Sequence, residues 1–166
     1  MFEENIMLDK SIMLDKNMVH LLEVDGDSVE QCSMLKCTDD QCRFTNAPLW
    51  TLLQAAYDNG IKGKCKVYAI YNRETVVGMV RLDFSVCNDC YEFTNLIIGA
   101  QHQRKHYATA AIKEIVKIFR NDGKNKVIKL RVAKDNVAAI ELYQKAGFIK
   151  QDNVADEHFY NYYMNI

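Results

Sequence analysis

The 166-residue chain contains a single proline, Pro48, which argues against a long linker or a disordered region. It has no apolar run long enough to cross a membrane. The charged residues Asp9, Lys10, Asp15 and Lys16 interrupt the segment where a secretory signal would need apolar residues. From these absences we expect one cytoplasmic domain that has no membrane partner.

Ligand spacing for a metal ion is also missing. A lone C-x-x-C motif begins at Cys87, but zinc would need a second ligand pair, and Cys37 and Cys42 are spaced too loosely to supply it. The histidines show no ligand-like spacing either. We therefore predict no metal site. Without a secretory context, we expect reduced thiols at all six cysteines, which are Cys32, Cys37, Cys42, Cys65, Cys87 and Cys90.

The net charge is only −1, but it is unevenly distributed: residues 1–40 carry −7 and residues 41–166 carry +6. This asymmetry fits two partners of opposite charge, and it fits ordinary solvated faces equally well. The lysines and arginines of residues 124–134 alternate along a predicted strand, and no RNA-binding motif accompanies them. We therefore predict no nucleic-acid partner.

Hydrophobic periodicity and turn residues divide the chain into elements. Residues 1–17 hold a tandem copy, IMLDKSIMLDK, which is too short for a repeat architecture, so we interpret them as a leader before one domain, 18–166. Helices are predicted from Ser28 or Asp27 to Cys37, and over Pro48–Asp58, Gln103–Asn121 and Asn136–Ala146. Strands are predicted over Met18–Val24, Lys66–Tyr71, Val76–Phe84, Tyr91–Ile98, Lys126–Lys134 and Phe159–Ile166.

The start of the helix predicted at Gln103 has the features of an anion site. Unpaired backbone N–H groups at a helix N-terminus favour phosphate, and Arg104 and Lys105 add positive charge beside them. The chain has neither a Walker loop nor the G-x-G-x-x-G dinucleotide fingerprint. On its own, this segment could equally be an ordinary solvated helix start.

Two stretches, LIIGAQHQRKHYATAAI and IKLRVAKDNVAAIELYQKAGF, resemble the GNAT superfamily of N-acetyltransferases. In the family pattern Q/R-x-x-G-x-G/A the three key positions are Gln103, His106 and Ala108, and the later asparagine and tyrosine are Asn136 and Tyr143. Two upstream stretches, LKCTDDQCRFTNAPLWTLLQAAYDNG and KVYAIYNRETVVGMVRL, are similar to bacterial diamine (spermine/spermidine) acetyltransferases.

The resemblance implies an α/β fold with a twisted, mostly antiparallel sheet of six to seven strands flanked by helices. The fourth and fifth strands would splay apart to admit acetyl-CoA as co-substrate. Amides from Arg104 to Thr109 would hold its pyrophosphate, and Leu96–Ile98 would pair with its pantetheine like an added strand. The residues implied in cofactor binding are Leu96, Ile97, Ile98, Gln103, Arg104, Lys105, His106, Tyr107, Ala108, Thr109, Asn136 and Tyr143.

The implied reaction is acetyl transfer to a primary amine of a small molecule, by direct attack in a ternary complex. By resemblance, Tyr143 would protonate the leaving thiolate. Alternation along its strand places Glu92 on one face with Thr94, Leu96 and Ile98, which makes it a candidate general base. A polyamine is the acceptor that the resemblance favours. Its ammonium groups need carboxylates and aromatic rings, and the candidates are Asp83, Asp89, Glu92 and Trp50.

His106 departs from the family pattern, which has glycine there. In a helical conformation its N–H would still donate, whereas a positive φ would strain it by roughly 1–3 kcal/mol and weaken acetyl-CoA binding. This departure leaves a second reading open, a non-catalytic or degenerate acyl-CoA-binding module. An acceptor on protein N-termini or antibiotic amines, and a homodimeric state, also stay open.

Overall fold

The structure is a computed structural model, and it describes residues 19–62, 65–84, 90–152 and 156–166. The predicted leader, residues 1–17, lies outside the described residues. So do Asp89, one of the predicted acceptor residues, and Cys87 of the C-x-x-C motif.

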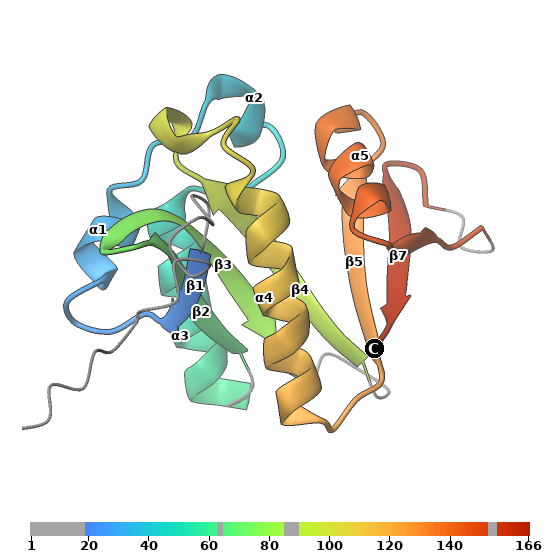
Figure 1. The fold of residues 1–166 in the computed structure, drawn as a ribbon, viewed down its shortest axis with the longest axis horizontal. Helices are drawn as coiled ribbons and strands as arrows, with labels where there is room; N and C mark the ends of the chain where they lie inside the picture. The colour runs from blue at the N-terminus through green and yellow to red at the C-terminus, as the bar shows by residue number, and fades with distance from the viewer. Residues whose placement is uncertain (1–18, 63–64, 85–89, 153–155) are drawn as a thin grey trace, which may run out of the picture.

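A seven-stranded sheet forms the centre of the molecule, with strand order β1-β2-β3-β4-β5-β7-β6 (Figure 1). Neighbouring strands are antiparallel except β4 and β5, which pair in parallel. The strands are β1 Val19–Glu23, β2 Cys65–Asn72, β3 Thr75–Asp83, β4 Cys90–Ile98, β5 Val127–Ala133, β6 Ile149–Lys150 and β7 Phe159–Asn165. This architecture confirms the predicted mixed α/β fold.

Helices cover both faces of the sheet. In Figure 1, α4 lies in front of the sheet, while α3 lies behind β2 and β3. The helices are α1 Val29–Ser33, α2 Asp39–Cys42, α3 Pro48–Lys62, α4 Tyr107–Asp122 and α5 Val137–Lys145, and a short 3₁₀ helix spans Ala100–His102. No helix in the described part of the chain is long and apolar enough to span a membrane.

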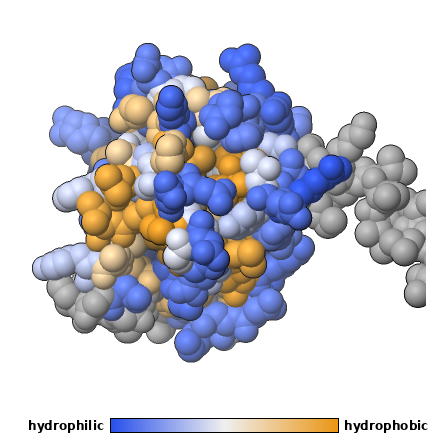
Figure 2. All heavy atoms as spheres, turned by 90° about the vertical axis from the view of Figure 1, so that its left-hand side faces the viewer, coloured by the Kyte–Doolittle hydropathy of each residue, from blue (hydrophilic) through white to orange (hydrophobic). Residues whose placement is uncertain are grey.

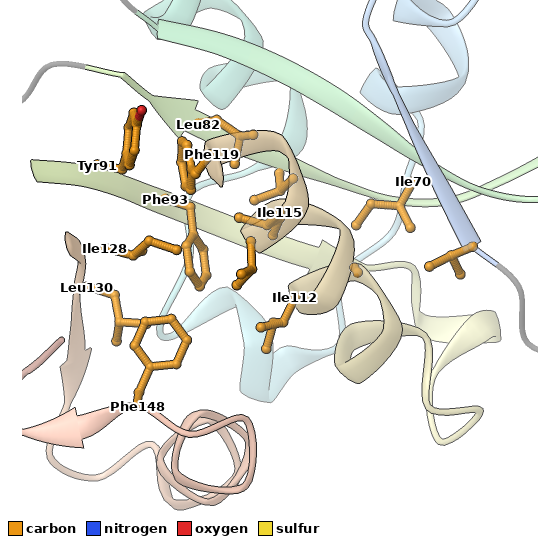
Figure 3. Packing of buried hydrophobic residues seen from close by; sticks show 14 of the residues in the cluster. Ile70, Leu82, Tyr91, Phe93, Ile112, Ile115, Phe119, Ile128, Leu130 and Phe148 are labelled. Carbon is orange, nitrogen blue, oxygen red and sulfur yellow. The ribbon is translucent and has the colours of Figure 1, made fainter. Parts of the chain in front are cut away.

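The larger core lies between α4 and the strands. The helix buries an apolar stripe at the spacing of one face, and Figure 3 shows its members Ile112, Ile115 and Phe119 close to strand residues. Phe119 stacks on Tyr91 of β4, with ring centroids 4.3 Å apart. A second, smaller core joins α1 and α3 to β2 and β3 on the opposite face. The predicted amphipathic stripe therefore fixes how α4 lies on the sheet.

Helix boundaries differ from the predictions at three places. The helix predicted through Cys37 ends at Ser33, and a separate helix, α2, begins at a capping box in which the Thr38 side chain accepts from the Gln41 N–H. Helix α3 continues past the predicted Asn59-Gly60 stop to Lys62. One glycine costs a helix only about 1 kcal/mol, which is too little to end it. Helix α4 begins at Tyr107, four residues later than predicted.

Strand β4 separates from β5 along most of its length while it stays paired with β3. It pairs with β5 only from Cys90 to Glu92, so its edge from Phe93 to Ile98 has no β5 partner. This geometry is the splayed fourth and fifth strand pair that the resemblance implied, and it opens the sheet where the α4 helix begins.

A β-bulge in β4 overturns one prediction about Glu92. The β3–β4 register shifts between Met79 and Arg81, and Asn95 in the bulge has a left-handed φ of 50°. Phe93, Leu96 and Ile98 all pack in the α4-side core. Odd-numbered residues therefore face this core before the bulge, and even-numbered residues face it after the bulge. Glu92 therefore shares its face with Thr94 but not with Leu96 and Ile98, because the extra residue reverses the alternation.

Candidate functional site

A cleft of about 1210 Å³ lies where β4 and β5 separate. One end is lined by the loop before α4, including Gln103, Arg104 and His106, and one wall by the start of α5 and Tyr143. The other end is lined by strand residues that include Glu92. The cleft therefore joins a helix N-terminus to a group of charged side chains through a strand edge with open hydrogen-bonding groups.

The loop before α4 presents a run of unpaired backbone donors. Arg104 and His106 both adopt left-handed backbone conformations, with φ values of 60° and 61°. The six consecutive N–H groups from Arg104 to Thr109 have no acceptor among the residues that the structure describes. Because donors gathered at a helix N-terminus attract anions, this end of the cleft suits a phosphate.

His106 adopts the strained one of the two conformations considered from the sequence. It is the N-cap of α4, but its side chain makes no capping hydrogen bond. A left-handed conformation costs an ordinary L-residue about 1–2 kcal/mol, whereas glycine adopts it freely. The positive φ explains why the family pattern has glycine at this position. His106 adopts the same left-handed conformation, and its side chain makes that conformation less favourable.

We expect His106→Gly to raise the free energy of unfolding by about 0.5–1 kcal/mol, as measured by urea denaturation. Released strain of about 1–2 kcal/mol exceeds the extra chain entropy of glycine, about 0.5–1 kcal/mol. The matched control is His102→Gly, at a position without positive φ, which should lower stability. Equal losses in the two variants would show that His106 is not strained.

Two glutamine side chains converge on the last carbonyl of β4. Gln41 Nε2 and Gln103 Nε2 each donate to the Ile98 carbonyl oxygen at 3.2 Å, and Gln103 Nε2 also donates to Gln41 Oε1 at 2.6 Å. Both lone pairs of that carbonyl are thereby used, so strand-like pairing with a ligand falls to the β4 edge before it. Sequence reasoning missed Gln41; the Thr38-x-x-Gln41 capping pattern was its signal.

Asn136 stands at the start of α5, on the facing wall of the cleft. Its side-chain oxygen accepts from the Ala139 N–H at 3.2 Å and caps the helix. The asparagine predicted from the family pattern therefore caps α5 and also lines the cleft.

Tyr143 of α5 lies between two aromatic rings, with centroid distances of 5.8 Å to Phe93 and 5.9 Å to Phe148. The ring of Tyr143 lines the cleft, and its hydroxyl has no hydrogen-bond partner among the described residues. Burial raises the pKa of Tyr143 to about 12. At neutral pH the hydroxyl is therefore a neutral donor, and no described residue accepts its hydrogen bond.

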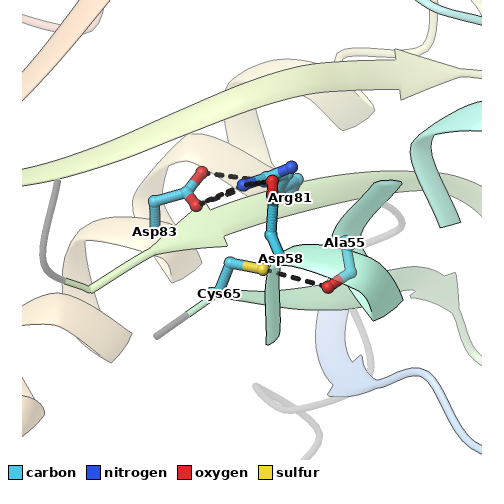
Figure 4. A network of polar contacts seen from close by, with 5 residues as sticks. All are labelled: Ala55, Asp58, Cys65, Arg81 and Asp83. Carbon is cyan, nitrogen blue, oxygen red and sulfur yellow. Dashed lines mark hydrogen bonds and ion pairs between the residues drawn. The ribbon is translucent and has the colours of Figure 1, made fainter. Parts of the chain in front are cut away.

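The charged end of the cleft is built around Arg81 of β3. Its guanidinium forms ion pairs with Asp58 and Asp83, each at 2.8 Å, and Figure 4 shows the pairing with Asp83 beside α3. Cys65, which also lines the cleft, donates to the Ala55 carbonyl at 3.2 Å. The predicted acceptor residue Asp83 is thus engaged by Arg81, because both side chains lie on the same strand face.

Glu92 lies beside this pair and is the carboxylate with the most perturbed environment at that end. Burial raises its pKa, and the negative charge of Asp83 raises it further, while Arg131 and Arg81 oppose the shift. A glutamate with a raised pKa is a better proton acceptor when ionised, which suits a general base.

Trp50, another predicted acceptor residue, does not line the cleft. It lies on α3 with 57% of its surface exposed, next to other exposed apolar residues of that helix, Leu49, Leu53 and Tyr57. Figure 2 shows that apolar side chains also gather on the face of the molecule on the α1 side. Gln54 and Asp58 of the same helix do line the cleft, so Trp50 lies one turn before the part of α3 that reaches it, and its role in acceptor binding stays a prediction.

Comparisons with known proteins agree with this fold. Residues 31–148 match the family described as "Acetyltransferase (GNAT) family". The uncharacterized N-acetyltransferase YobR of Bacillus subtilis is 28% identical over 97 residues, which are 58% of this chain and 36% of that protein. The chain thus spans about a third of the length of this curated relative.

Solved structures share the architecture. Spermidine N-acetyltransferase from Vibrio cholerae, in complex with CoA and spermine, has a TM-score of 0.72 at 19% identity, covering 89% of this chain and 95% of that one. An aminoglycoside acetyltransferase in complex with coenzyme A has the same TM-score and coverage at 16% identity. At these identities the likeness establishes the fold, and the family match, residues 31–148, covers most of the chain. The chain belongs to the acetyltransferase (GNAT) family.

Proposed function

We propose that this protein is an acetyl-CoA-dependent N-acetyltransferase that acetylates a primary amine of a small molecule in a ternary complex. One observation carries the proposal: the segment from Arg104 to Thr109, whose six amides have no acceptor among the described residues, lies at one end of a cleft whose other end holds Glu92, with Tyr143 on the wall between them. Membership in the acetyltransferase family supports the same reaction.

The residues present fit acetyl-CoA as the co-substrate. The amides from Arg104 to Thr109, flanked by the side chains of Arg104 and Lys105, would hold its pyrophosphate. The open edge of β4 from Phe93 to Ile97 would pair with its pantetheine, and Asn136 would contact it from the facing wall. When bound, acetyl-CoA supplies the acetyl group as an activated thioester.

Glu92 and Tyr143 are the two side chains proposed to handle protons during the reaction. The acceptor arrives as an ammonium and must lose a proton before its nitrogen can attack; Glu92, directly or through water, is the group that takes it. The C–N bond forms as the C–S bond breaks, and the nitrogen then loses a second proton, which the leaving thiolate takes through solvent. One proton in total is therefore released for each amide and free thiol produced. Tyr143 donates a hydrogen bond to the sulfur as negative charge develops there.

A polyamine is the acceptor that the sequence resemblance favours, and the Vibrio cholerae enzyme solved with spermine supports it. Against it, Asp83 is already paired with Arg81, and Trp50 lies outside the cleft. The proposal therefore names a small-molecule primary amine, and the acceptor class is argued separately below.

Release of free thiol from acetyl-CoA, followed with a chromogenic disulfide reagent, tests the proposal. We expect amine-dependent release with at least one member of a panel of polyamines, amino acids, aminoglycosides and a short peptide with a free N-terminus. Titration of coenzyme A by calorimetry accompanies the assay. Binding without turnover would identify a non-catalytic acyl-CoA-binding module, and no binding would overturn the proposal.

A further inference from the structure

The acceptor end of the cleft has a cation on its β5 side. Ile128, Leu130 and Val132 of β5 pack into the α4-side core, so Lys129 and Arg131, which alternate with them, lie on the opposite face of the sheet. Glu92 of β4 is directly opposite Lys129 in the parallel register. Of the two β5 cations, Arg131 lines the cleft.

The Arg131 guanidinium is held in place by two contacts with described residues and keeps N–H donors for a ligand. It forms one ion pair, to Asp156 at 3.1 Å, and it stacks over the Phe159 ring at 4.5 Å. Asp156 is itself fixed, because its Oδ1 accepts from the His158 and Phe159 N–H groups at 2.9 and 3.0 Å. An arginine offers five N–H donors, and among the described residues only Asp156 accepts from them, so the guanidinium has donors left for a ligand in the cleft that it lines.

Most carboxylates at this end already form ion pairs with arginines and are therefore less available to bind an ammonium group. Asp58 and Asp83 both bind Arg81, and Asp156 binds Arg131. Of the lining carboxylates on α3, β3 and β4, Glu92 is the one without an ion pair to a described residue, and it lies close enough to Arg131 to be influenced by its charge. Asp40 of α2 also lines the cleft, beside Gln41, which bonds the Ile98 carbonyl at the end of β4. A polycation would need several open carboxylates and would meet Arg131, whereas an amine with its own negative group would match both charges.

We propose that the acceptor amine also carries a carboxylate, which Arg131 binds while the amine nitrogen lies near Glu92. This inference rests on the proposed acetyltransferase function and names the substrate class of the same site. A planar carboxylate is the anion that best matches a guanidinium fork preoriented on an aromatic ring.

Matched pairs of amines test the inference: lysine against cadaverine, arginine against agmatine, and tyrosine against tyramine. Each pair differs by one carboxylate. We expect the carboxylate-bearing member of at least one pair to have a kcat/KM about 10- to 100-fold higher, as for a hydrogen bond to a charged group. Arg131→Gln should bring that ratio close to one, chiefly by raising KM for the carboxylate-bearing member, and Arg131→Lys should restore part of it.

Lys129→Gln is the matched control, because it removes a cation from the same strand face outside the cleft lining, and it should keep the ratio. Equal or better turnover of the carboxylate-free members, or of spermidine, would overturn the inference while the acetyltransferase function stood. So would an unchanged ratio in a folded Arg131→Gln variant, with folding checked by its melting temperature. Coenzyme A binding without acetylation of any amine would overturn the proposed function and this inference together.

Discussion

Tyr143→Phe is expected to lower kcat about 100-fold while changing coenzyme A affinity less than about threefold, as measured by thiol release and calorimetry. The hydroxyl has no acceptor among the described residues, so a developing thiolate can take its hydrogen bond without displacing another. Its pKa of about 12 makes complete proton transfer to a thiolate unfavourable. The expected effect is therefore that of one hydrogen bond made in the transition state.

The control for this prediction is Tyr57→Phe, which removes a hydroxyl from an exposed tyrosine outside the cleft and should leave kcat unchanged. Both variants keep the aromatic ring, so the contacts of Tyr143 with Phe93 and Phe148 persist. A Tyr143→Phe enzyme with wild-type kcat would refute a role for the hydroxyl, and loss of coenzyme A binding would point to packing instead.

Glu92→Gln is expected to lower kcat/KM for the acceptor amine about 100-fold at neutral pH. The base works in its ionised form, so activity falls as pH drops through its pKa. Because burial and Asp83 raise that pKa, the acidic limb of the wild-type profile should lie above the usual glutamate range. Removing the negative charge with Asp83→Asn should lower the Glu92 pKa and move the limb to lower pH.

Glu74→Gln is the matched control for the charge change, since Glu74 is exposed in the β2–β3 turn. It should leave both kcat/KM and the pH profile as in the wild type. If Glu92→Gln retains the wild-type profile, the base is another group or a water molecule, and the assignment of Glu92 fails.

The residues proposed to hold acetyl-CoA could be named from the sequence because their determinants are local. Gln103, Arg104 and His106 precede α4 directly, and a helix N-terminus exposes its amides wherever the helix lies. The motif residues Asn136 and Tyr143 are similarly placed by the short helix α5 that carries them. Even there, the left-handed turn at His106 could not be chosen from the sequence, because histidine permits both conformations considered.

The surroundings of the residues assigned to the acceptor were harder to predict, because they depend on contacts between distant segments. Asp83 was expected to be open, but Arg81 pairs with it and with Asp58 from another element. Alternation placed Glu92 on the wrong face relative to Leu96 and Ile98, because a single-residue bulge reverses the pattern.

By itself, the sequence determined the amphipathic face of α4 and the run of amides that begins this helix, because periodicity and chain order specify such features, and its resemblance to the GNAT superfamily implied the fold class. The tertiary structure alone decided where β4 and β5 part, which carboxylates are already paired, and that Gln41 and Arg131 reach the cleft. Those features depend on side chains brought together from segments up to about a hundred residues apart, and no local pattern encodes that proximity.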